Sequence, residues 1–356
     1  MNRELLQSIC VAPSITIKEA IQKFNETGQK ILFVVDEHSA LIGTMTDGDI
    51  RRGLLHGMGF GDSVTKTMCQ NFCKLSSHTA SFHERAKALM IEQTIESIPV
   101  VNELGAIVDV ISWRDVFDVP PKKERREYPN QVVIMAGGRG TRLDPFTRIL
   151  PKPLVPVGNK PVVELIMERF NTYGFSHFIY TLNYKKEYLK LFLRELQSLY
   201  TIDWIEEEDF LDTAGSLSLL KDKLNETFFV INCDSLIDVD FEEVLRWHLQ
   251  EKAMITIVGC HKEVHVPFGV LKCENGSLQS IIEKPVHDVI INTGLYVIEP
   301  SALHLIPCGE PLAMDVLIQR ATKQAKVSVY PIQEGWLDLG QWKEYRNAIS
   351  KLEGNE

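Results

Sequence analysis

Apolar and polar positions follow the same order twice within the first third of the chain. A shift of 66 residues lays Phe33–Ile50 over Pro99–Val116 without a gap, and Val34 then falls on Val100. Each copy predicts a helix, a β-rich apolar run, a short turn, a second apolar run and a polar helix start. Since duplicated units bury their faces on one another, residues 1–117 are predicted to form two packed units, about 1–60 and 61–117.

The pattern breaks at residues 118–130, where DVPPKKERREYPN combines paired prolines with a basic run and no apolar periodicity. Such a segment is typical of an exposed linker. From Gln131 onward, short apolar runs alternate with longer amphipathic stretches, which predicts strands alternating with helices around a largely parallel sheet. The expected organisation is therefore two units, a linker at 118–130 and an α/β domain at 131–356.

Composition narrows the class of protein without naming its chemistry. The chain has 356 residues, 44% hydrophobic and 24% charged, and a formal charge of −10. This charge argues against a general nucleic-acid or membrane-surface binder, because both partners are polyanionic. No apolar run is long enough to cross a bilayer, and the N-terminus does not resemble a signal peptide. Seven cysteines without a Cys-x-x-Cys pair suggest reduced thiols and a cytoplasmic protein.

A glycine turn follows the first strand expected in the α/β domain. The apolar run VVIMA ends at Ala136, and Gly137, Gly138 and Gly140 come next. A Walker P-loop requires Lys-Ser or Lys-Thr after its last glycine, and a dinucleotide fingerprint requires a glycine where Leu143 stands. The sequence matches neither pattern.

Two cations close to this turn suggest that it binds phosphate. Backbone N–H groups of a glycine turn can approach phosphate oxygens, while Arg142 and Lys152 can neutralise their charge. Pro151 and Pro153 restrict the backbone on both sides of Lys152, so the reach of this lysine is set in advance. The alternative is a tight turn with surface cations.

The first 117 residues resemble a tandem pair of CBS domains, a Bateman module. The signature is Gly43-x-x-Thr46-x-x-Asp49, with a weaker echo at Ser112 and Asp115. In that family these positions often hold the phosphate and ribose of an adenine nucleotide. Asp109 replaces the glycine in the second copy. The same spacing is also an ordinary helix-capping arrangement, so a purely structural or dimerising module is the alternative.

Residues 130–350 resemble sugar-1-phosphate nucleotidyltransferases, which join a nucleoside triphosphate to a sugar-1-phosphate and release pyrophosphate. The resemblance begins with the glycine turn followed by Pro151-Lys152-Pro153-Leu154. It implies a doubly wound, Rossmann-like α/β domain of the glycosyltransferase-A-like kind. Further motifs follow in the family's order: Asn183-Tyr184, EDFLDTAGSL at 208–217, VINCDS at 230–235, Phe268-Gly269-Val270, Glu283-Lys284-Pro285, Asn292-Thr293-Gly294-Leu295-Tyr296 and GWLDLGQWKEY at 335–345.

Two aspartates are candidates for a metal site. Asp234 closes the apolar strand expected at Phe228–Ile231, and Asp338 stands at another expected strand end. Carboxylates at the carboxyl edge of an open α/β sheet lie where such folds bind ligands, and Mg²⁺ prefers oxygen ligands. By the resemblance, both bind Mg²⁺. Taken alone, each is more often a helix cap or a loop residue.

The resemblance also assigns the substrate contacts. Arg142 and Lys152 would contact the phosphates of the nucleotide and stabilise the leaving pyrophosphate. Glu283 and Lys284 would contact the sugar hydroxyls and the sugar phosphate, for which a surface ion pair is the alternative. The remaining implied contacts form two sets: for the nucleotide, Ala136, Gly137, Gly138, Gly140, Thr141, Asn183, Thr213, Ala214 and Gly215; for the sugar, Asn292, Thr293 and Gly294.

Three positions depart from the family pattern. Met135 replaces a leucine in the first motif, which changes only packing. Asp212 replaces the glycine of Leu-Gly-Thr-Ala-Gly and puts bulk and charge beside a substrate. Cys233 replaces the glycine of Asn-Gly-Asp and is expected to be a buried small residue rather than a nucleophile.

The arrangement resembles bacterial CBS-bearing guanylyltransferases that make GDP-glucosamine for nonulosonic, legionaminic-type acids. We therefore expect a homo-oligomeric enzyme that uses GTP and glucosamine-1-phosphate, with an adenine nucleotide at the CBS pair as a further expected ligand. Asp212 could attract the ammonium group of an amino sugar. Mannose-1-phosphate and glucose-1-phosphate are alternative substrates. A catalytically silent nucleotide sensor and an assembly scaffold are alternative functions.

Overall fold

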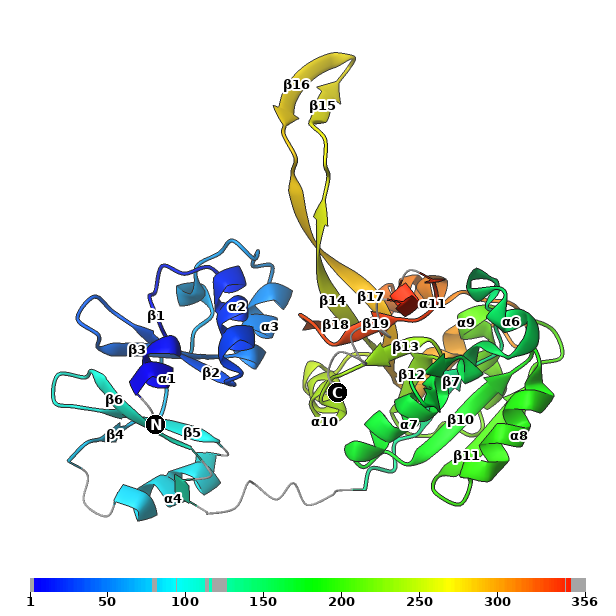
Figure 1. Cartoon of the computed structure of the whole chain (residues 1–356), viewed down its shortest axis with the longest axis horizontal. Helices are drawn as coiled ribbons and strands as arrows, with labels where there is room; N and C mark the ends of the chain where they lie inside the picture. The colour runs from blue at the N-terminus through cyan, green and yellow to red at the C-terminus, as the bar shows by residue number, and fades with distance from the viewer. Residues whose placement is uncertain are drawn as a thin grey trace. The chain divides into compact units, whose positions relative to one another are not determined.

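A computed structural model describes residues 3–78, 82–93, 95–112, 115–116, 127–342 and 344–346. The chain divides into two compact units, Met1–Glu124 and Arg125–Glu356, which are coloured blue to cyan and green to red in Figure 1. Residues 118–126 of the expected linker lie outside the described residues. No helix in the described ranges is long and apolar enough to cross a membrane.

The first unit contains the predicted repeat as two three-stranded sheets (Figure 1). In each sheet the central strand runs parallel to the first strand and antiparallel to the third. Strands β2 and β5 start 66 positions apart, and so do β3 and β6, so the repeat is confirmed. The strands are β1 (Cys10–Val11), β2 (Ile31–Val35), β3 (Leu41–Thr46), β4 (Leu75–Ser76), β5 (Ser97–Val101) and β6 (Ile107–Ser112); the helices are α1 (Arg3–Ser8), α2 (Ile17–Thr27), α3 (Asp47–Leu55) and α4 (Phe82–Gln93).

The two copies use the same turn between their paired strands and meet there. Asp36 Oδ1 accepts two backbone N–H groups at 2.9 Å, and Asn102, which occupies the same place in the second copy, accepts two at 3.0 and 2.9 Å. The Leu41 N–H donates to the Gly105 carbonyl at 3.0 Å, which joins the two turns. Val101 and Val110 of the second copy pack into the core of the first.

The second unit is built on a seven-stranded sheet in the order β11-β10-β7-β12-β17-β14-β18. All neighbouring strands are parallel except β17, which is antiparallel to both of its neighbours. This α/β arrangement agrees with the predicted fold class. The strands are β7 (Val132–Met135), β10 (His177–Leu182), β11 (Thr201–Glu206), β12 (Phe228–Asn232), β14 (Ile255–His265), β17 (Val286–Ile298) and β18 (Val327–Ile332); the main helices are α7 (Val162–Thr172), α8 (Lys186–Leu196), α10 (Phe241–Glu251) and α11 (Met314–Thr322).

Aromatic side chains lock one face of this sheet to its helices. Phe170 of α7 stacks on Phe241 of α10 with ring centroids 3.8 Å apart, and it meets Phe229 of β12 edge to face at 5.3 Å. All four residues of β7 are buried, as expected for a central strand covered on both sides. The strand that leads to the glycine turn is therefore held within the buried centre of the sheet.

The second unit begins earlier than the sequence suggested. Tyr128 stacks on Phe175 with centroids 4.7 Å apart, and its N–H donates to the Gly174 carbonyl at 3.0 Å. The Asn130 amide donates to the Thr227 carbonyl at 2.7 Å. Residues 127–130, which the sequence assigned to the linker, are therefore anchored beside the starts of β10 and β12. The stacking of Tyr128 on Phe175 anchors this segment, although its basic, proline-rich sequence predicted a linker.

A long ribbon extends from the edge region of the sheet. Strands β14 and β17 remain paired from Gly259 and Asn292 out to His265 and Val286. A second hairpin, β15 (Val270–Glu274) and β16 (Ser277–Ile282), follows at the far end. Figure 1 shows this ribbon standing clear of the helices of its own unit.

Candidate functional site

A small two-stranded sheet brings together two acids that are distant in sequence. Strands β13 (Ser235–Ile237) and β19 (Trp336–Asp338) pair antiparallel, with Ser235 opposite Asp338. The Leu339 N–H donates to the Asp234 carbonyl at 2.9 Å and extends this pairing. Asp234 and Asp338 therefore lie side by side at the carboxyl end of β12, the edge of the sheet where the sequence placed them.

Three of the predicted catalytic side chains converge on Gly340. A Cβ atom added to this glycine would lie 2.5 Å from Asp234 Oδ2, 2.9 Å from Asp338 Oδ1 and 3.3 Å from Lys152 Nζ. Lys152 forms an ion pair with Asp234. The two side chains are only 12% and 13% exposed, so solvent screens this pair weakly. Gly340 leaves open the point where these charges meet, and a larger residue there would displace the three side-chain ends.

The two acids fit a hard divalent cation. Their oxygens face one point, and the Gly340 N–H donates to Asp338 Oδ1 at 2.8 Å, which fixes the orientation of that carboxylate. In the described ranges, no group of three or more His, Cys, Asp or Glu side chains is arranged to hold a metal. Two carboxylates suit Mg²⁺, which usually takes one or two carboxylates and completes its shell with water and phosphate oxygens.

The glycine turn lies directly beside Lys152. Gly140 adopts a left-handed φ of 66°, and a Cβ there would lie 3.1 Å from Lys152 Cβ. The buried Thr147 hydroxyl donates to the Gly140 carbonyl at 2.9 Å and supports the turn from beneath. Between residues 137 and 140, no backbone N–H donates to another atom of the described chain. These donors are therefore available for an anion.

Arg142 and Thr141 are exposed on a short 3-10 helix, η2 (Thr141–Leu143), which follows the turn. Gly138 is also exposed, whereas Ala136 and Gly137 are buried. A second short helix, η3 (Lys152–Leu154), begins after Pro151 and carries Lys152. Arg142 and Lys152 therefore lie on two short helices that follow the glycine turn.

Glu207 is a candidate site residue that the sequence reasoning missed. It is 4% exposed, and burial raises the pKa of its carboxyl group. Its Oε2 accepts the Leu211 N–H at 3.2 Å, while Oε1 faces Gly137, 2.8 Å from where a Cβ would stand. Asn183 lies against the same glycine and donates to the Glu207 carbonyl at 3.4 Å. One feature of the sequence could have indicated Glu207: it is an acid directly after β11, at the carboxyl end of a parallel strand.

The Thr213-Ala214-Gly215 segment is held against a later loop. The N–H groups of Ala214 and Gly215 both donate to the Leu312 carbonyl, at 2.8 and 3.0 Å. The Thr213 hydroxyl accepts the Met314 N–H at 2.8 Å. The N–H groups of Ala214 and Gly215 are thus occupied within the protein.

The expected sugar residues divide into two groups. Gly294 lies against Asn232 and Ser235, which flank Asp234, and its N–H donates to Asn292 Oδ1 at 3.0 Å. Thr293, by contrast, is 1% exposed, and its hydroxyl donates to the Val258 carbonyl at 2.7 Å. Its side chain points into the core, because the β-bulge between Ile257 and Gly259 leaves a carbonyl that needs a donor.

Glu283 and Lys284 do not join this cluster. Both are exposed and lie on the projecting ribbon, between β16 and β17. The sequence motif placed them at the sugar phosphate, but the pairing of β14 with β17 carries them away from Asn292.

Two of the three departures from the family pattern have structural explanations. Asp212 adopts a left-handed φ of 60°, a conformation that glycine favours and aspartate tolerates. Its Oδ1 accepts the Thr213 N–H at 2.6 Å. Cys233 is buried, and desolvation, with the adjacent Asp234 charge, raises the pKa of its thiol to about 12. It therefore has no thiolate character at neutral pH, as the sequence suggested.

In the first unit, the expected nucleotide positions are engaged with each other. Thr46 and Asp49 form a reciprocal capping box at the start of α3, with the Thr46 hydroxyl 2.7 Å from Asp49 Oδ2. Ser112 and Asp115 repeat the hydroxyl–carboxylate contact at 2.7 Å. The capping arrangement weighed in the sequence analysis is thus present, and nucleotide binding at these residues stays a prediction.

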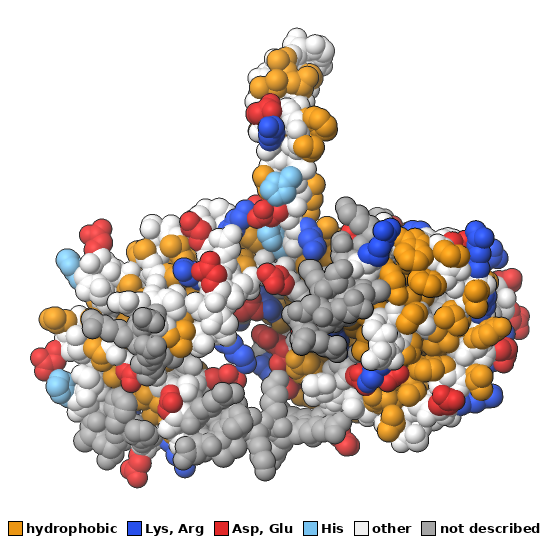
Figure 2. Space-filling model, in the orientation of Figure 1, with side chains coloured by type: hydrophobic (Ala, Val, Ile, Leu, Met, Phe, Trp, Pro, Cys, Tyr) orange, Lys and Arg blue, Asp and Glu red, His pale blue; other side chains and the backbone are white. Residues whose placement is uncertain are grey.

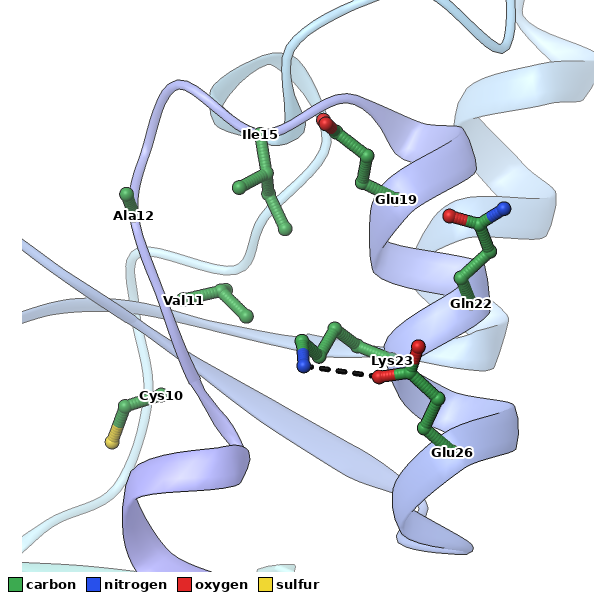
Figure 3. Close-up of a pocket in the computed structure, with 8 residues that line it drawn as sticks. All are labelled: Cys10, Val11, Ala12, Ile15, Glu19, Gln22, Lys23 and Glu26. Carbon is green, nitrogen blue, oxygen red and sulfur yellow. Dashed lines mark hydrogen bonds and ion pairs between the residues drawn. The ribbon is translucent and has the colours of Figure 1, made fainter.

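A hollow of 330 Å³ also lies in the first unit, between the segment after α1 and helix α2. Figure 3 shows Glu19, Lys23 and Glu26 on α2, with Lys23 extended toward the segment that carries Val11 and bonded to Glu26. Burial raises the pKa of the Cys10 thiol to about 11. None of the four expected nucleotide residues lines this hollow.

Comparison with known families agrees with the fold. The nucleotidyl transferase family model matches residues 131–355, so the chain belongs to this family. The CBS domain model matches residues 1–56. Both resemblances drawn from the motifs are therefore confirmed.

Similar proteins include a probable mannose-1-phosphate guanylyltransferase 3 of Oryza sativa subsp. japonica, 32% identical over 62% of this chain and 63% of the relative. The mannose-1-phosphate guanylyltransferase catalytic subunit beta of Xenopus tropicalis is 32% identical over the same shares. The chain thus spans less than two thirds of the length of these relatives. The crystal structure of HddC from Yersinia pseudotuberculosis complexed with GMP-PN is 26% identical, with a TM-score of 0.51, over 63% of this chain and 99% of that chain.

The convergence on Gly340 predicts the effect of one added methyl group. Gly340→Ala should lower the free energy of unfolding of the second unit by about 1–3 kcal/mol, because its Cβ displaces two carboxylates and an ammonium. Gly138→Ala is the matched control, since nothing lies within 4 Å of its added Cβ. Urea denaturation of both variants checks this, and equal stability of the two would contradict the geometry.

Proposed function

We propose that the chain is a sugar-1-phosphate nucleotidyltransferase that uses Mg²⁺. In this reaction a phosphate oxygen of the sugar-1-phosphate attacks the α-phosphorus of a nucleoside triphosphate. The new P–O bond forms as the bond to the β-phosphate bridging oxygen breaks, and pyrophosphate leaves with that electron pair. The observation that carries the proposal is the convergence of Lys152, Asp234 and Asp338 on Gly340, beside a turn with available N–H donors.

The chemistry requires charge neutralisation rather than a side-chain base. The sugar phosphate is already an anion, so the barrier lies in bringing several phosphate charges together. The turn from Gly137 to Gly140 donates N–H groups to the triphosphate, and Lys152 and Arg142 neutralise the leaving pyrophosphate. Asp234 and Asp338 would hold Mg²⁺, which supplies Lewis-acid stabilisation of the phosphate oxygens when bound.

Lys152 has two roles in this scheme. Without substrate it neutralises Asp234, which keeps two adjacent carboxylates from repelling each other. When the nucleotide is bound, its ammonium group turns to the phosphates. Lys152 lies between Pro151 and the first turn of η3, so its backbone has little freedom to move while the side chain reorients.

Glu207 supports guanine as the base. An ionised carboxylate only accepts hydrogen bonds. Guanine presents two adjacent donors, N1–H and the N2 amino group, whereas uracil and thymine present one N–H between two carbonyl oxygens. A buried carboxylate beside Gly137 and Asn183 would bond guanine twice and repel the carbonyls of the pyrimidines. The similar proteins described above are mannose-1-phosphate guanylyltransferases, which supports this choice.

For the sugar we propose glucosamine-1-phosphate, made into a nucleotide sugar for cell-surface glycans such as the nonulosonic acids. Asp212 supports this choice, because one of its oxygens accepts the Thr213 N–H and the second can face an ammonium group. Mannose-1-phosphate and glucose-1-phosphate lack that group and are the alternative substrates.

The first test is turnover. Full-length protein mixed with GTP, Mg²⁺ and a panel of hexose-1-phosphates should release pyrophosphate. Asp234→Asn and Asp338→Asn should each reduce this release by about 100-fold or more, because each removes charge from the metal site. Asp203→Asn, at an exposed position on β11, is the control and should retain full activity. A folded wild type that binds GTP without turnover would support a silent nucleotide sensor, and self-association without GTP binding or turnover would support a scaffold.

A second prediction concerns the base. Glu207→Gln should reduce the preference for GTP over UTP by about 10- to 100-fold, the effect of losing a charged hydrogen bond. Relative to wild type, the same variant should gain stability as the pH rises through the range in which this carboxyl ionises: burial raises its pKa in the folded state, so ionisation of Glu207 opposes folding. Competition kinetics and pH-dependent unfolding measure the two effects. Glu208→Gln, at the exposed adjacent acid, is the control, and an unchanged GTP/UTP ratio in Glu207→Gln would refute the assignment.

A third prediction concerns the sugar. Asp212→Gly should leave the backbone unstrained, because glycine adopts the φ of 60° freely. It should reduce kcat/KM for glucosamine-1-phosphate while leaving that for glucose-1-phosphate nearly unchanged. If the ratio of kcat/KM for the two sugar phosphates stays the same, Asp212 does not recognise the amino group.

A further inference from the structure

The projecting ribbon, here called the arm and defined as residues 261–291, exposes an unusual amount of apolar surface. Twenty-two large hydrophobic side chains are exposed in the described ranges, and eleven of them belong to the arm. Figure 2 shows these side chains along the ribbon above the body of the molecule. They are Val264, Phe268, Val270, Leu271, Leu278, Ile281, Ile282, Val286, Val289, Ile290 and Ile291.

Both faces of the arm are apolar. Successive residues of a strand point to opposite faces, and the exposed residues include the consecutive pairs Val270-Leu271 and Ile281-Ile282 and the run 289–291. If the arm lay on its own unit, only one of these faces would be covered. A two-stranded ribbon with two wet apolar faces is marginal in stability and prone to association.

The base of the arm is firmly held. The β14–β17 ladder continues from the central sheet, and His261 and Asp288 bond across it at 2.9 Å. Ile290 packs directly on Gly259, leaving no room for a side chain there. The buried bond from Thr293 to the Val258 carbonyl fixes the bulge below it. Bending the arm back onto its own site would break these contacts.

This geometry separates Lys284 from the site of its own chain. Val286 lies six residues from Asn292 along one strand, which spans about 20 Å at roughly 3.3 Å per residue. The two residues from Val286 back to Lys284 can recover at most about 7 Å. The backbone of Lys284 therefore stands more than about 10 Å from that of Asn292, outside the cluster around Gly340.

The arm also carries little net charge. Residues 261–291 contain three lysines and four acids, a net charge of −1. This small absolute charge adds little repulsion between two copies that meet through their arms. Eleven half-exposed side chains offer on the order of 1,000 Å² per arm, enough for a stable symmetric interface.

We propose that the arm packs on a second copy of this chain, in an exchanged dimer that places Lys284 of each arm at the partner's Asp234–Asp338 site. The second copy covers the apolar faces that remain exposed to solvent in the single chain. It also supplies the sugar-phosphate cation that each site lacks. The role of Lys284 rests on the proposed function, whereas the interface itself does not.

The interface is tested by the mass of the full-length protein. Sedimentation velocity over a concentration series should give a dimer, and Ile281→Ser should raise its dissociation constant tenfold or more. Leu191→Ser is the matched control: Leu191 on α8 is 64% exposed and Ile281 is 61% exposed, so both changes remove similar exposed surface. A monomeric wild type, or equal dissociation constants for the two variants, would overturn the interface.

The exchange is tested by complementation. Lys284→Ala and Asp234→Asn should each be nearly inactive alone. When the two are co-expressed, half of the dimers are mixed and one site of each mixed dimer is intact, so about a quarter of wild-type activity should return. No recovery would assign Lys284 to its own chain and overturn the exchange. A wild type that releases no pyrophosphate would defeat the proposed function, and the sedimentation result would still decide the interface.

Discussion

The pairing of Lys152 with Asp234 is the contact on which the rest of the site depends. The β13–β19 pairing forces Asp234 and Asp338 together, and two poorly screened carboxylates would repel each other strongly without a cation. Lys152 supplies that cation from a segment bounded by prolines. The Trp342 indole, which donates to the Asp144 carbonyl at 2.6 Å, ties the end of the chain to the same region. The charge cluster is thus held from three distant parts of the sequence.

The sequence predicted those features in which a functional residue type stands at a definite place in an apolar pattern. The CBS-like repeat, the buried strand before the glycine turn and the two acids at strand ends could all be read from local patterns. Each has a short-range cause: a duplicated alternation of apolar residues, four buried residues in a row, and a carboxylate placed where a strand stops. The convergence of Lys152, Asp234 and Asp338 agrees with that expectation, because strands of one sheet end at a common edge.

Other features depend on contacts that no local pattern encodes. Glu207 was missed because an acidic run after a strand usually faces water, and only the approach of Gly137 and Asn183 buries it. Thr293 was assigned to the sugar, but a bulge on the neighbouring strand uses its hydroxyl. Lys284 belongs to a family motif, yet its position is set by how far the β14–β17 ladder continues. In each case the deciding partner is far away in sequence.

The anchor formed by Tyr128 and Asn130 has a mechanical consequence. These residues attach the incoming chain beside the starts of β10 and β12, and β7 follows at once and ends at the glycine turn. The anchor and the glycine turn therefore lie at opposite ends of one short buried strand, four residues and about 13 Å long. A displacement of the anchor would reach the glycine turn along this strand, without passing through a loop.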